Sequence, residues 1–141
     1  MRYFVFIAVL LVSALPACRG ASRENAFEGT LGDAMIEFIE NVEELAGDMT
    51  AIDSVGDCRD AESRIEGRVE TLRRLHPIVD TFTAETWKEM PQGLIERRDQ
   101  ALRSFNQEAV RVLLDRDRAA VLRHALRDVP SLIYPSRRER G

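Results

Sequence analysis

Between residues 29 and 52 the apolar residues recur at alternating gaps of four and three, and this regularity restricts the fold more than any other feature. A strand needs a period of two, whereas gaps of three and four keep side chains on one face of a helix. Ile39 and Ala46 widen this apolar stripe, and acidic residues fill the other faces. We therefore predict an amphipathic helix from about Gly29 to Ile52. The regularly spaced positions are Leu31, Met35, Phe38, Val42, Leu45, Met49 and Ile52.

The rest of the chain continues as helical segments separated by glycine, proline and capping residues. Residues 52–57 contain a glycine and several capping side chains, a composition typical of a turn between two helices. Pro77 is expected to kink or end the helix that begins near residue 57, because proline lacks an amide donor and disfavours helix at the residue before it. Pro130 is expected to end the last helix. The predicted helices after the first are 57–75 or beyond, 92–114 and 118–128, with a short helix or turn within 83–91.

The composition favours an all-α fold. Ala, Leu, Arg and Glu are abundant, whereas the 141 residues include only six Phe, two Tyr and one Trp. A chain of this length forms one domain with a single core. We expect an up-and-down helical bundle of three long helices plus one or two short ones at residues 27–130, followed by a flexible basic tail at 131–141. A long protruding hairpin of the first two helices is the alternative.

The first 17 residues have the layout of a secretory signal peptide. Met1 and Arg2 form a short positive start, and the apolar run from Tyr3 to Leu15 is broken only by Ser13. A helix of this run spans about 20 Å, which is short of the roughly 30 Å hydrocarbon core of a bilayer. We therefore expect a cleaved export signal at 1–17 rather than a permanent transmembrane helix.

The apolar run ends in Leu15-Pro16-Ala17-Cys18, which resembles the lipobox of bacterial lipoproteins. The resemblance implies cleavage before Cys18 and a thioether-linked diacylglycerol on this residue, with a tether at 18–26. It also implies a location at the cell membrane or outer membrane; in an organism with two membranes, Arg19 in place of Asp favours the outer one. Ordinary signal cleavage, which would leave a soluble periplasmic or secreted protein with a free Cys18, is the alternative.

The state of the second cysteine depends on the first. If Cys18 carries a lipid, Cys58 is the only remaining thiol and is expected to be a small buried core residue. If Cys18 is free, a disulfide between Cys18 and Cys58 can form in an oxidising compartment.

The charges are distributed unevenly along the chain. The net charge is −4, which argues against nucleic acid as a partner. Residues 24–62 carry 12 acidic side chains and one basic one, whereas residues 63–141 carry 16 basic and 12 acidic ones. We expect the acidic first helix to lie against the arginine-rich later helices. The alternative is that its carboxylates bind a cationic partner, and the candidate residues are Glu37, Glu40 and Glu44.

No spacing typical of a catalytic, metal or cofactor site occurs. Neither His76 nor His124 follows a glutamate by three residues, and paired-cysteine, zinc-binding and phosphate-loop motifs are missing. We expect no enzyme activity, no metal and no cofactor.

Trp87 is a candidate binding residue because it lies in the interrupted segment between helices. These features favour a lipid-anchored binding or scaffolding module that contacts another envelope protein; the alternative is an exported carrier of a small apolar ligand with a cavity near Trp87.

Overall fold

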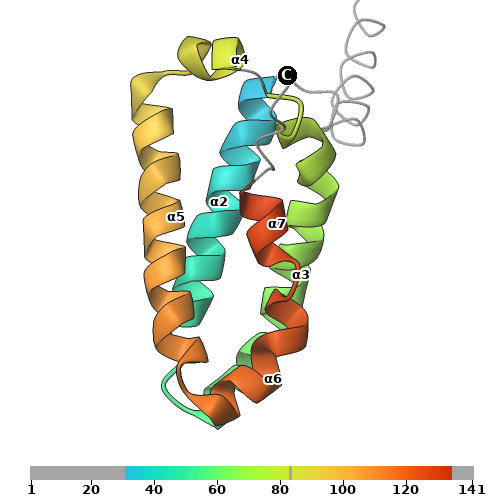
Figure 1. Cartoon of the computed structure of the whole chain (residues 1–141), viewed down its shortest axis with the longest axis vertical. Coiled ribbons are helices and arrows are strands. Elements are labelled where there is room, and N and C mark those ends of the chain that lie inside the picture. The colour runs from blue at the N-terminus through green and yellow to red at the C-terminus, as the bar shows by residue number, and fades with distance from the viewer. Residues whose placement is uncertain (1–30, 83, 135–141) are drawn as a thin grey trace, which may run out of the picture.

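The computed structural model describes residues 31–82 and 84–134, and this part of the chain is all-helical, as predicted. α2 and α3 run antiparallel, α5 lies beside α2 and parallel to it, and α6 with α7 lies beside α3 and parallel to it, so that successive helices alternate in direction as in an up-and-down bundle (Figure 1). Residues 31–82 and 84–134 contain three shorter helices instead of the one or two predicted, because the fourth position of the bundle is shared by α6 and α7. The helices are α2 Leu31–Thr50, α3 Val55–Val79, α4 Ala84–Glu89, α5 Gln92–Leu113, α6 Arg116–Leu126 and α7 Val129–Ile133.

α2 is the central helix of the bundle and packs against both α3 and α5. Its predicted stripe is confirmed over most of its length, since the five positions from Met35 to Met49 are each at most 2% exposed. Ile39 and Ala46 are buried as well. A helix with partners on two sides needs a wider apolar face than a helix with one partner, and these two residues supply it. Leu31, at the start of the helix, is 45% exposed.

The turn predicted between the first two helices is present, and a capping box closes the start of α3. The Ser54 hydroxyl accepts a hydrogen bond from the Asp57 amide at 3.1 Å, and the Asp57 carboxylate accepts one from the Ser54 amide at 2.8 Å. These reciprocal bonds satisfy amides that have no partner inside the helix.

Pro77 does not end α3, which continues to Val79. Leu75 and Val79 are at most 2% exposed, and the Asp80 amide still donates to the His76 carbonyl at 2.8 Å. Burial of the final turn therefore offsets the loss of the one hydrogen bond that proline cannot make.

The predicted boundary at residue 130 is wrong, because α7 includes Pro130 and extends to Ile133. Proline is tolerated in the first turn of a helix, where its missing amide has no carbonyl partner. Leu132 and Ile133 are 7% and 3% exposed, so residues 131–133 belong to the core and not to a tail.

The predicted signal peptide, the tether with Cys18 and the rest of the tail lie outside the described residues. Within the described ranges no helix is both long and apolar enough to cross a membrane.

Candidate functional site

The acidic surface of α2 is bordered by arginines from both neighbouring helices. On the α5 side, Arg97 donates two hydrogen bonds to the Glu43 carboxylate, at 2.7 and 2.6 Å. The bond to Glu43, and then the nearby charge of Glu40, raise the pKa of Arg97 above its ordinary value. This two-pronged geometry is the strong form of an arginine–carboxylate pair.

On the α3 side, ion pairs join the two helices at several levels. Arg74 lies 3.3 Å from Glu37, Arg68 lies 2.5 Å from Glu44, and Arg64 lies 3.1 Å from Asp48. The prediction that the acidic helix lies against arginine-rich helices is therefore confirmed. Of the candidate binding carboxylates, Glu37 and Glu44 form ion pairs with α3, and both Glu40 and Glu44 are exposed.

Arg111 on α5 is a structural residue that the sequence analysis missed. Its guanidinium donates hydrogen bonds to the carbonyl oxygens of Met49 and Ile52, each at 2.9 Å, and to that of Thr50 at 3.3 Å. It also pairs with Glu108 at 2.7 Å. The last turn of α2 contains no basic residue of its own, so Arg111 supplies both the missing donors and the positive charge that favours a helix carboxyl end. No sequence signal identifies this contact, because backbone carbonyls are present at every residue.

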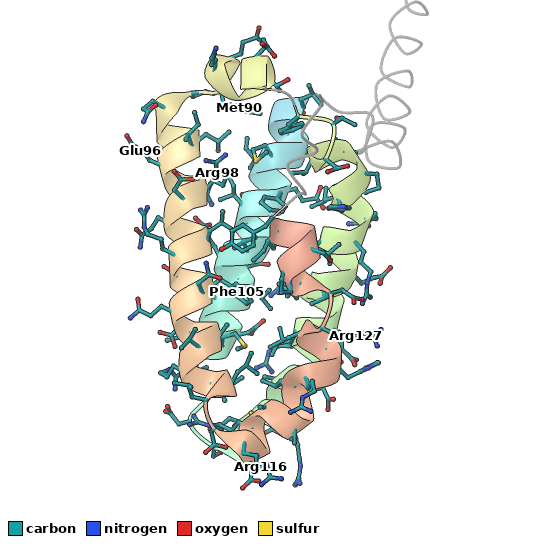
Figure 2. The ribbon with its side chains drawn as sticks, viewed as in Figure 1. Met90, Glu96, Arg98, Phe105, Arg116 and Arg127 are labelled. Atoms are coloured by element: carbon teal, nitrogen blue, oxygen red, sulfur yellow. The ribbon has the colours of Figure 1, made fainter. Side chains whose placement is uncertain are left out.

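Trp87 lies in α4, the short helix across one end of the bundle (Figure 1). Its side chain is outside the described part of the chain. Met90, at the junction of α4 and α5, is partly buried against the core (Figure 2). The predicted apolar cavity near Trp87 therefore remains a prediction.

A surface cavity of about 450 Å³ lies between α3 and α6, away from α4. Its lining is largely polar, and His124 contributes one wall. Arg73 in this lining pairs with Asp128 at 2.9 Å, which holds the pKa of Asp128 below its ordinary value. The lining residues are Ser63, Glu66, Gly67, Val69, Glu70, Arg73, His124 and Ala125.

The remaining reactive side chains are dispersed. Cys58 is a free thiol buried at the start of α3, as expected for a core cysteine, and burial raises its pKa. His76 is half-buried on α3 and His124 is exposed on α6. In the described ranges no group of three or more His, Cys, Asp or Glu side chains has the geometry to hold a metal ion.

The outer face of α5 exposes apolar side chains near the end of the helix. Val110 is 59% exposed, Leu113 is 38% exposed, and Leu114, which follows the helix directly, is 80% exposed. These residues lie beside the α5–α6 turn, at the opposite end of the bundle from the start of α2 (Figure 1). The other large apolar side chains exposed in the described ranges are Leu31, Ile36 and Tyr134. No protein-family model, curated protein or solved structure matches the chain.

Proposed function

We propose that this protein is exported, is held at a membrane of the cell envelope by a lipid on Cys18, and uses its helical surface to bind another envelope protein without catalysing a reaction. The observation that carries the proposal is the sequence Leu15-Pro16-Ala17-Cys18 directly after an apolar run of signal-peptide length. The lipid would confine the bundle to the membrane surface, where a second anchoring signal or a bound partner strengthens attachment.

The fold is compatible with such an anchor. The described bundle begins at Leu31, so 12 residues, 19–30, lie between Cys18 and the described start of α2. α2 has 20 residues and spans about 30 Å. A chain tethered before Leu31 would therefore hold the α4 end of the bundle closer to the lipid than the α5–α6 turn, which would point away from it.

A binding role fits the surface better than a carrier role does. The exposed Val110, Leu113 and Leu114 form an apolar area of the kind that marks contact sites on soluble domains. A carrier of apolar ligands needs an enclosed apolar cavity, whereas the cavity between α3 and α6 is lined by charged residues such as Glu66, Glu70 and Arg73.

The first experiment is an intact-mass and amino-terminal analysis of the mature protein recovered from its own membrane fraction. We expect a chain that starts at Cys18 and carries a diacylglyceryl group. A Cys18→Ser variant is the control, because serine cannot form the thioether, and it should appear in the soluble fraction. An unmodified wild-type chain in the soluble fraction would overturn the anchor and make the carrier function the leading hypothesis.

A further inference from the structure

Five exposed residues on the outer face of α5 follow the spacing of a coiled-coil seam. They are separated by alternating gaps of three and four, which places them in one line along the helix. Glu96, one step before this line, points away from the bundle, whereas Phe105 points inward and is 5% exposed (Figure 2). We call this line the α5 seam; its residues are Gln100, Arg103, Gln107, Val110 and Leu114.

The α5 seam carries one charge, whereas charged side chains flank it at Glu96, Asp99 and Arg111. Between residues 100 and 114 the exposed residues include Asn106 and Leu113 besides the seam, and Arg103 is the single charged one. The exposed face of α3, by contrast, is highly charged. Depletion of charged residues, with arginine retained, distinguishes the centre of protein interfaces from ordinary surface. The charged residues exposed on α3 are Arg59, Asp60, Arg64, Glu66, Glu70, Arg73 and Arg74.

We propose that the α5 seam is the docking face for an amphipathic helix of a partner protein. This inference rests on the proposed function and specifies which surface performs it. The partner helix presents apolar side chains to Val110 and Leu114 and a carboxylate to Arg103. In such recognition the docked helix supplies apolar anchors on one face, and the gaps of three and four along the seam would let it lie along α5.

The carboxylate follows from the surroundings of Arg103. Its guanidinium donates to the neutral amide oxygen of Gln100 at 3.1 Å. Among the described residues no carboxylate lies within salt-bridge distance of Arg103, whereas Arg97 on the same helix has Glu43 as a partner. A carboxylate on the docked helix would complete the interaction of Arg103 and fix the register of the two helices.

A second copy of this chain fits the seam less well than a different helix does. One half of the seam is polar, with Gln100 and Arg103, and the other half is apolar, with Val110 and Leu114. Antiparallel pairing along the whole seam would place each apolar half against a polar half. Parallel pairing would match the apolar halves but would bring Arg103 against its own copy, and like charges in direct opposition are unfavourable.

The test is site-specific photo-cross-linking of the full chain in its own cell envelope. A benzoylphenylalanine probe replaces Gln107 on the seam, and a matched probe replaces the exposed Ser63 on α3. The supporting result is one protein cross-linked from position 107, with the attachment point mapped to an amphipathic helix that carries an Asp or Glu within a heptad of its apolar residues. Capture of a protein without that mapped helix would overturn the proposal.

Seam variants complete the test. Leu114→Asp and Arg103→Glu should each reduce the yield from position 107 about tenfold or more, whereas Arg103→Lys should retain most of it. Leu114 and Arg103 are exposed, so the melting temperature of these variants should match that of the wild type. An unchanged cross-link in Leu114→Asp would contradict the seam.

The remaining outcomes separate this inference from the proposed function. A cross-link from position 63 but not from position 107 would refute the seam and leave the proposed binding function standing. A product with twice the mass of the chain would show that the occupant is a second copy, and a lipid adduct would show that the face meets the membrane; either result overturns the inference. Absence of a cross-link from both positions, on a chain that carries no lipid, would refute both proposals.

Discussion

At the scale of single residues, Arg111 binds the carboxyl end of a helix that precedes it by about 60 positions. Its donors reach carbonyl oxygens that α2 leaves without intrahelical partners, and charged donors make stronger hydrogen bonds than neutral ones. We expect Arg111→Met, which keeps much of the side-chain length, to lower the free energy of unfolding by about 2–3 kcal/mol. Urea unfolding followed by circular dichroism measures this change.

The matched control is Arg116→Met, since Arg116 is an exposed arginine at the start of α6. This change should alter the free energy of unfolding by less than about 0.5 kcal/mol. Equal losses in the two variants would show that the contacts of Arg111 with α2 add nothing to stability.

Two helix-capping aspartates make the stability depend on pH. The Ser54 hydroxyl, together with backbone amides, lowers the pKa of Asp57, and chiefly the Arg118 amide lowers the pKa of Asp115. A carboxylate whose pKa is lower in the folded state stabilises the protein above its unfolded pKa of about 4 and loses that effect as the pH falls through the folded value. We therefore expect the urea midpoint to decrease below about pH 4.

The variant Asp57→Asn should show a smaller decrease in the urea midpoint between about pH 5 and pH 2.5, because one of the titrating caps is removed. Ser63→Ala removes no carboxylate and should keep the full decrease. An identical acid response in wild type and Asp57→Asn would contradict the role of this cap.

At the scale of elements, α7 contributes to the core although it has only five residues. Leu132 is 7% exposed and packs with the core cluster. We expect Leu132→Ala to cost about 3 kcal/mol of unfolding free energy, since truncation of a buried leucine removes apolar contact and leaves a cavity. Thermal and urea unfolding measure the loss. Ala120→Ser, at an exposed site on α6, should change stability by less than about 0.5 kcal/mol.

The helices were predictable from the sequence where the spacing of apolar residues alone determines the structure. The stripe from Met35 to Met49 is periodic and buried, and α5 begins and ends within a residue of its predicted bounds. The predictions at Pro77 and Pro130 relied on the local properties of proline, whereas burial of Val79 and Ile133 decided the outcome. Tertiary packing of this kind has no signature within a short window of sequence.

The candidate site was predictable only in outline. Charge counts indicated that an acidic helix meets basic ones, but pairs such as Glu43 with Arg97 depend on the rotation of each helix about its axis. The α5 seam was missed because its glutamines carry no charge and interrupt the apolar pattern, so its spacing became evident only when exposure was known.

At the scale of the whole molecule, the ion pairs on both flanks of α2 favour one arrangement of the helices over others. Exposed pairs contribute little stability individually, but reversed charges penalise a wrong register. We expect Glu43→Arg and Arg97→Glu to destabilise the protein singly and the double variant to recover part of the lost stability.

The coupling between the two substitutions is obtained from a double-mutant cycle of urea unfolding at low salt. At about 1 M salt the coupling should shrink, because the screening length falls to about 3 Å. Additive losses at low salt would show that the contact between Glu43 and Arg97 does not orient α5 against α2.

The contact of Arg111 with the end of α2 also bears on the order in which the molecule is made. A chain is synthesised from its amino end, so α2 and α3 exist before Arg111 has been added. Until then, water must bind the carbonyl oxygens of Thr50 and Ile52, and the flank of α2 that later meets α5 is uncovered. We therefore expect the early hairpin to unwind more easily than the finished bundle, which would suit the export proposed above. We expect the bundle to resist unwinding only after α5 has packed against α2 and Arg111 has bound the carbonyl oxygens at the end of α2.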